Sequence, residues 1–139
     1  ELIRSKAFIM ERERFDGADV AHLIRCGADD LDWRHLLEGF GEHWHVLFSH
    51  LVLFQYIYPA VRDRVPEALL RELSERLLTE RDQPPPEEDI CRGTMLSRTQ
   101  YIEDIDQWGC TDSRVEPHGA LSERQAERLS PRETGDDED

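Results

Sequence analysis

The segment from Val46 to Tyr58 places the strongest constraint on how this chain folds. Its apolar run is interrupted only by one serine, one histidine and one glutamine, and it stops at Pro59. A helix that spans a bilayer needs roughly 20 apolar residues, so the segment is too short to cross a membrane. We therefore predict a buried helix here.

Apolar residues recur at helical spacing on both sides of this segment, which predicts an all-α fold. We expect a small irregular bundle of about five or six helices with a disordered acidic C-terminal tail. The first helix is expected from about Glu1 to Arg14, the second is capped by Asp16 and ended by Gly27, and the third is capped by Asp30 or Asp32. The buried segment is the fourth helix. A fifth helix follows Pro66 and carries a stripe of Leu69, Leu70, Leu73, Leu77 and Leu78, and a short helix capped by Ser97 closes near Trp108 and Gly109.

Three consecutive prolines, Pro84 to Pro86, divide the chain, because they remove backbone donors and impose an extended backbone. We expect a helical bundle over residues 1–81, a Pro-rich linker over 82–90 and a short capped helix packed on the bundle over 91–110. Apolar residues then become sparse and the chain ends in an acidic run, which predicts a disordered tail over 111–139. The sequence suggests no strand pair.

Composition narrows the function. A chain of 139 residues supports one core, and 17 basic against 31 acidic residues give a net charge of −14. This charge disfavours general nucleic-acid binding, which depends on basic side chains that displace counterions. Three cysteines without a close pair favour reduced thiols in a cytoplasm. Because the chain opens at Glu1 in a helical pattern, we expect it to begin inside a larger protein.

Lys6 is the single lysine of the chain, and helical spacing places it near the middle of the apolar arc of the first helix, between Leu2 and Met10. A lysine in that position has two roles open to it. It either packs its alkyl stem and extends its ammonium to water, or it points into a polar cleft where the ammonium meets a phosphate.

Asp16 and Asp19 bring two carboxylates into the first turn of the second helix, near the end of the first. As N-cap and third helical residue they resemble a capping box, which stabilises a helix start without any ligand. A functional role beside Lys6 is the alternative.

Residues 1–8, ELIRSKAF, are followed by the pattern Arg12-x-Arg14-x-Asp16-x-x-Asp19-Val20. Together they resemble the segment after the catalytic sheet in bacterial nucleotidyltransferases of the DNA polymerase β-like superfamily. Residues 91–101, CRGTMLSRTQY, and the later Trp-Gly pair look like the tail of a bacterial group within that superfamily. The resemblance covers about residues 1–114.

The resemblance implies that Lys6 contacts the nucleotide phosphates. It also implies that Asp16 and, less closely, Asp19 are the catalytic candidates, which support the active site from the start of the second helix.

Phe15 stands where the family has a basic residue, and Arg12 and Arg14 are the residues expected to compensate by binding nucleotide. The Gly-Ser turn and paired aspartates that hold Mg²⁺ in this superfamily are absent from the sequence. We therefore expect the magnesium ligands upstream of this chain, with an NTP as substrate and this chain inactive by itself.

Other residues favour structural roles. Among His43, His45 and His50, only the first and last share a helix face, whereas zinc needs three or four convergent ligands. We expect His50 to be a core histidine with one hydrogen bond. The aromatic side chains of Trp33, Trp44 and Tyr56 are expected in the core.

The sequence thus predicts the C-terminal helical portion of a nucleotidyltransferase, with its own N-terminal catalytic half as a partner. It leaves the NTP and the acceptor open, whether protein, RNA or a small molecule. The alternative is a non-catalytic helical protein-interaction module.

Overall fold

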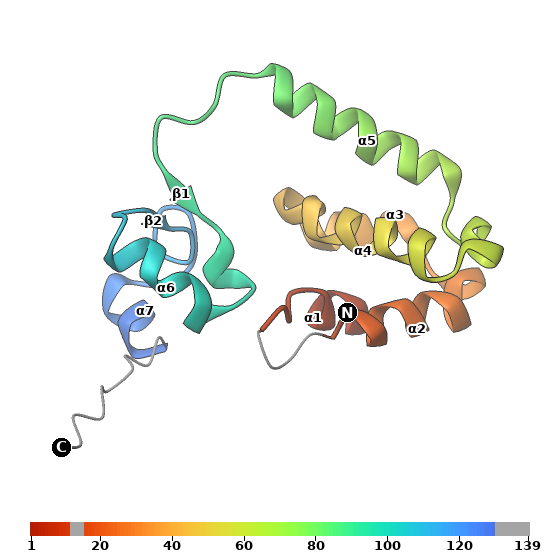
Figure 1. Ribbon diagram of the computed structural model, residues 1–139, viewed down its shortest axis with the longest axis horizontal. Helices are drawn as coiled ribbons and strands as arrows, with labels where there is room; N and C mark the ends of the chain where they lie inside the picture. The colour runs from red at the N-terminus through yellow and green to blue at the C-terminus, as the bar shows by residue number, and fades with distance from the viewer. Residues whose placement is uncertain (12–15, 130–139) are drawn as a thin grey trace. The chain divides into compact units, whose positions relative to one another are not determined.

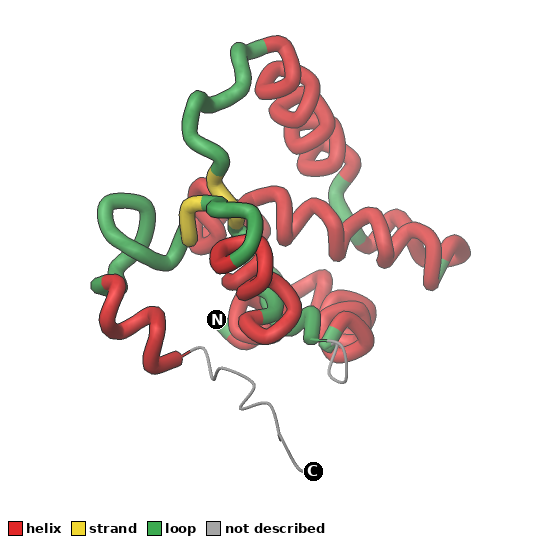
Figure 2. Tube along the Cα trace, turned by 60° about the vertical axis from the view of Figure 1, so that its left-hand side comes forward, coloured by secondary structure: helices red, strands yellow, loops and turns green. Residues whose placement is uncertain are grey.

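The computed structural model describes residues 1–11 and 16–129. It divides into two compact units, Glu1–Pro85 and Pro86–Asp139, which we describe separately. Helices make up most of the described residues (Figure 2), so the expected all-α class is confirmed. No helix among the described residues has the length and apolar character needed to cross a membrane.

Unit 1 is built around a central helix, α4, which lies between α5 on one side and α1 and α2 on the other (Figure 1). Short 3₁₀ turns join α2 to α3, α3 to α4 and α4 to α5. The α-helices among the described residues of this unit are α1 (Leu2–Ala7), α2 (Gly17–Gly27), α3 (Trp33–Phe40), α4 (Trp44–Ile57) and α5 (Glu67–Asp82).

The starts of α3 and α5 follow the sequence signals. The Asp32 side chain accepts a hydrogen bond from the His35 amide at 3.0 Å and so caps α3. Gly41 takes a φ of +53° directly after α3, a conformation that glycine adopts without steric cost. Pro66 immediately precedes α5.

Helix α4 contributes to the core of unit 1 along one side, but not all of its apolar residues are buried. Its inward residues are Trp44, Leu47, His50, Leu51 and Phe54. Four apolar residues of its C-terminal half remain exposed and form what we call the α4 stripe: Val52, Leu53, Tyr56 and Ile57. Tyr56 is 84% exposed, so its expected place in the core was wrong. A helix that is apolar all round needs neighbours on every face, whereas α4 is covered only in part.

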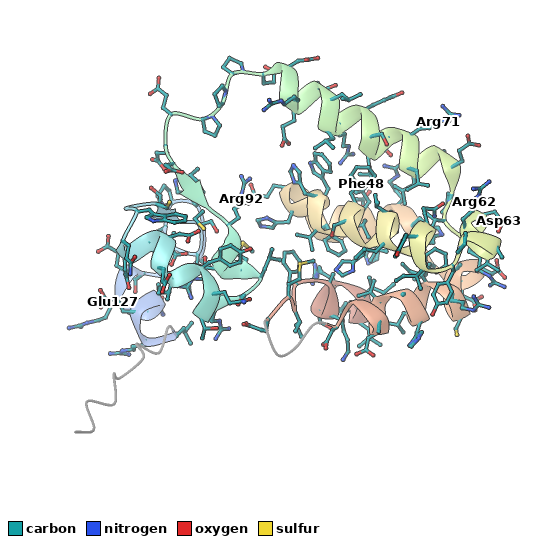
Figure 3. All side chains as sticks on the ribbon, in the orientation of Figure 1. Phe48, Arg62, Asp63, Arg71, Arg92 and Glu127 are labelled. Atoms are coloured by element: carbon teal, nitrogen blue, oxygen red, sulfur yellow. The ribbon has the colours of Figure 1, made fainter. Side chains whose placement is uncertain are left out.

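The leucine stripe of α5 is buried only in its first half. Leu69 and Leu73 lie in the core, whereas Leu77 and Leu78 are 44% and 66% exposed. The predicted stripe is therefore covered over its first half only. In the second half, the Glu80 carboxylate accepts a hydrogen bond from the His45 ring at 2.8 Å. Figure 3 shows Phe48 on the side of α4 that faces α5 and Arg71 on the outer side of α5.

Unit 2 contains more structure than the sequence suggested. Thr111 to Leu129, expected to be disordered, contributes a strand and a helix, while residues 130–139 lie outside the described residues. The unpredicted strand pair is parallel, with Ile90 opposite Thr111. A buried polar network, described below, lies in this region, where Ala126 is the one buried apolar side chain among the described residues. The elements are β1 (Ile90–Cys91), α6 (Arg98–Asp106), β2 (Thr111–Asp112) and α7 (Glu123–Leu129).

Candidate functional site

Lys6 lies on the short helix α1, between two residues that anchor the helix to the core. Ile3 and Ala7 are buried, with exposed fractions of 5% and 0%. The Lys6 side chain is 28% exposed, so it is neither sealed in the core nor free in water. This half-buried position agrees with the place that helical spacing gave it.

The Lys6 ammonium forms ion pairs with two carboxylates. Its Nζ lies 3.1 Å from Asp19 Oδ2 and 3.6 Å from Asp16 Oδ2. The Asp16 side chain is 12% exposed and that of Asp19 is 51% exposed. The structure therefore brings together the three described residues that the sequence motifs singled out.

Helix capping does not explain the direction of the Asp16 side chain. Asp16 is the N-cap residue of α2, and its carbonyl accepts from the Val20 amide at 3.2 Å. Its carboxylate, however, makes no capping hydrogen bond to the start of the helix. The expected capping box is therefore not formed through Asp16, and its carboxylate lies against Lys6 instead. Asp19, in the first turn, still complements the helix dipole.

The backbone around Lys6 is fixed by contacts that end α1 early. The helix stops at Ala7 rather than near Arg14, so the expected length was wrong. The ring of Phe8, directly after α1, stacks on the ring of Phe40, with ring centroids 5.7 Å apart. The Ile9 amide donates to the Lys6 carbonyl at 3.1 Å and thereby closes the last turn. This tertiary stacking competes with the helical periodicity that the sequence continues.

A second contact reaches α1 from the core. His50 Nε2 lies 2.8 Å from the Ala7 carbonyl oxygen, and the histidine is 3% exposed. Burial lowers the pKa of His50, although the hydrogen bond to the carbonyl opposes this shift. His50 is thus a core histidine, as expected.

The charge balance at Lys6 decides what the site can bind. One ammonium faces two carboxylates, so these three residues carry a net charge of −1. An anion gains a charge-assisted hydrogen bond from Lys6 only where a carboxylate gives way or where other cations join. Asp19 is the more exposed of the two carboxylates and is the one with room to turn away. Arg12 and Arg14, the expected compensating cations, lie outside the described residues.

The described residues do not assemble ligands for a metal. Residues 1–11 and 16–129 contain no group of three His, Cys, Asp or Glu side chains placed to hold an ion. Mg²⁺ is therefore not assigned to this chain's own described side chains. The three histidines of the α4 region contact different groups. The ring of His43 packs against the Phe8 ring, the ring of His45 lies against the Glu80 carboxylate, and the ring of His50 lies against the Ala7 carbonyl oxygen.

The second motif, residues 91–101, supports the fold of unit 2. Gly93 lies under the Tyr101 ring so closely that a Cβ at Gly93 would overlap it. Thr94 is buried and donates its hydroxyl to Asp112 Oδ1 at 2.9 Å. Ser97 is fully buried at the start of α6. These residues account for a motif whose role the sequence left open.

Sequence reasoning missed the partner of that motif, a buried ion pair. Arg114 Nη2 donates to Asp112 Oδ2 at 2.6 Å, and both side chains are 8% exposed. Burial opposes ionisation of Asp112, but hydrogen bonds from Arg114 and Thr94 hold the pKa of its carboxyl below its usual value. The only sequence signal was an acid and a base two residues apart in a region assigned to a tail.

The free thiols of unit 2 are not activated. Burial and a neighbouring Asp104 raise the pKa of Cys91, and burial and Asp89 raise that of Cys110. Because the thiolate is the reactive form of cysteine, neither residue is set up as a nucleophile.

Comparison of the chain with protein-family models, curated proteins and solved structures finds no match.

Proposed function

We propose that this chain is the C-terminal helical portion of a nucleotidyltransferase that transfers a nucleotidyl group from an NTP to an acceptor. The observation that supports this most directly is the meeting of Lys6 with Asp16 and Asp19. These three residues belong to the motifs that carry the resemblance to polymerase β-like nucleotidyltransferases, and they come from α1 and from the start of α2. An ammonium directed out to solvent, away from both acids, would have removed this support.

In this proposal Lys6 is the phosphate ligand. Its ammonium is partly exposed, and a compact ammonium binds phosphate oxygens as a point charge. An incoming triphosphate takes the position of the Asp19 carboxylate at Lys6, because Asp19 is the more exposed partner. Asp16 remains against the ammonium and keeps it in place beside the start of α2.

The catalytic carboxylates are assigned to a half of the protein upstream of Glu1. Mg²⁺ held by those upstream carboxylates would supply positive charge to stabilise the charge that develops as pyrophosphate leaves. The residues of this chain bind and orient the nucleotide. Assayed by itself, the chain should not transfer nucleotides.

The test is Lys6→Ala in the full-length enzyme. Loss of one charge-assisted phosphate contact removes about 1.5–3 kcal/mol of binding, which lowers kcat/KM for the NTP roughly 10- to 150-fold. Arg71→Ala is the matched control, because Arg71 is an exposed cation on the outer side of α5. An unchanged dependence of rate on NTP concentration in the Lys6 variant would remove Lys6 from the site.

A direct binding measurement is available from the side-chain resonance of Lys6. In full-length protein labelled with isotope in its lysine side chains, the resonance that is missing from a Lys6→Arg variant belongs to Lys6. Addition of ATP and Mg²⁺ to the full-length protein should shift this resonance. A resonance that stays in place at saturating ATP argues against contact between Lys6 and the phosphates.

A protein-interaction module is the second candidate, and the α4 stripe favours it. Contiguous exposed apolar surface on a folded protein often marks a contact with another protein. The coding sequence ahead of Glu1 separates the two candidates. A Gly-Ser turn followed by an Asp-x-Asp strand there supports the enzyme, whereas a start codon at or near Glu1 supports the module.

A further inference from the structure

His50 lies in the core of unit 1 and reaches a helix that is distant in sequence. It belongs to α4, is 3% exposed, and places its Nε2 2.8 Å from the carbonyl oxygen of Ala7. A carbonyl oxygen only accepts hydrogen bonds, so Nε2 must carry the proton and donate it. The contact therefore fixes which ring nitrogen is protonated.

The Ala7 carbonyl is a group that α1 cannot satisfy by itself. The last carbonyls of a helix have no partner within the helix, and those buried in a core need one elsewhere. Ala7 is the last residue of α1 and is fully buried, and His50 supplies the donor.

Helix α1 depends on such tertiary contacts for its position. It has six residues, whereas isolated helices shorter than about 12 residues are marginal in water. His50 holds the carbonyl of the peptide unit between Ala7 and Phe8, one residue after Lys6. A shift of this carbonyl would move the Lys6 Cα and, with it, the ammonium relative to Asp16 and Asp19.

We propose that His50 is a positioning residue for nucleotide binding: its Nε2–H holds the Ala7 carbonyl and thereby sets the location of the Lys6 ammonium. The proposal rests on the proposed function of Lys6 as the phosphate ligand. His50 itself touches neither nucleotide nor acceptor. Its effect on the reaction passes through the backbone of α1.

Two substitutions in the full-length enzyme separate hydrogen bonding from packing. His50→Gln keeps an N–H donor close to the place of Nε2, while His50→Leu fills the space with no donor. We expect the leucine variant to raise KM for the NTP about fivefold or more with kcat within about twofold, and the glutamine variant to restore KM. Phe54→Leu, one turn further along α4, is the control for a weakened core and should leave KM unchanged.

The side-chain resonance of Lys6, assigned by its loss in Lys6→Arg, gives a second readout that does not depend on catalysis. It should shift in His50→Leu and return toward its original position in His50→Gln. If the leucine variant does not give a native circular dichroism spectrum, His50→Asn replaces it, since the shorter amide does not reach the carbonyl. A folded donor-free variant with unchanged KM and unchanged lysine resonance overturns the proposal, as does a glutamine variant as impaired as the leucine one.

Lys6→Ala, measured in the same assay, separates the role of Lys6 in nucleotide binding from the role of His50 in positioning Lys6. An unchanged KM in that variant refutes the role of Lys6 in nucleotide binding, whereas the lysine resonance in the His50 variants still reports whether His50 positions Lys6. An impaired Lys6 variant beside a normal His50→Leu variant refutes only the role of His50.

Discussion

Replacing Arg114 by methionine should destabilise unit 2 more than any exposed substitution there. Asp112 accepts hydrogen bonds from the Thr94 hydroxyl, the Arg114 amide and the Arg114 guanidinium, which approaches to 2.6 Å. Methionine removes the guanidinium and leaves a carboxylate that is 8% exposed with two of these donors. The charge of the Asp112 carboxylate then stays buried without the guanidinium that compensated it.

The magnitude follows from that burial. Removing one partner of a buried ion pair destabilises a protein by about 3–5 kcal/mol, because the other charge stays buried and unpaired. Small domains have a total stability of roughly 5 kcal/mol, so the Arg114 variant should lose most of the stability of unit 2. The double variant Asp112→Leu, Arg114→Met should be less destabilised than Arg114→Met alone, because it buries no unpaired charge.

Amide hydrogen exchange measures this effect in unit 2 by itself. The Thr111 amide donates to Asp89 and the Ser113 amide donates to Cys91, so both report opening between β1 and β2. Both should exchange much faster in Arg114→Met, while Arg124→Met, at an exposed position on α7, should change their protection by less than about 0.5 kcal/mol. Equal protection in the two single variants would refute the view that the buried pair holds this region together.

Three further predictions concern single sites. His50 is buried in its neutral form and its pKa is lowered. Its contribution to the stability of unit 1 is therefore present above the unfolded-state pKa of about 6.5 and is lost as the pH falls below that value. In urea titrations from pH 7.5 to 5, the free energy of unfolding should depend less on pH in His50→Gln than in the unchanged protein. Gly93→Ala should destabilise unit 2 by about 1–3 kcal/mol, because the added methyl overlaps the Tyr101 ring, and Tyr101→Ala should relieve part of that loss in a double-mutant cycle of thermal melts. Tyr56→Ser should change the free energy of unfolding by less than about 0.5 kcal/mol, and a larger loss in a denaturant titration would show that the α4 stripe is covered within this chain.

The sequence was most informative where local chemistry decides the structure. The cap at Asp32, the glycine after α3 and the proline before α5 act through their own backbone and near neighbours, so their effect is readable from the printed chain. The position of Lys6 on an apolar arc was readable in the same way, because helical spacing alone places it there.

The extent of α1 and the burial of α4 were not readable in this way. Helical periodicity continues past Ala7, but stacking of Phe8 on Phe40 ends the helix first. Tyr56 has the aromatic character of a core residue, yet burial depends on whether another element covers it. Both outcomes depend on packing between residues far apart in the chain.

The sequence by itself determined that the chain is helical, that a proline segment divides it, and that its one lysine lies near a helix start bearing two carboxylates. Only the tertiary structure decided that both carboxylates pair with the ammonium and that His50 donates a hydrogen bond to the Ala7 carbonyl. It also decided that Asp112 and Arg114 form a buried ion pair in a region rich in charge. The reason is physical. Periodicity and capping act over a few residues, whereas a hydrogen bond or ion pair between distant residues forms only after the helices have packed.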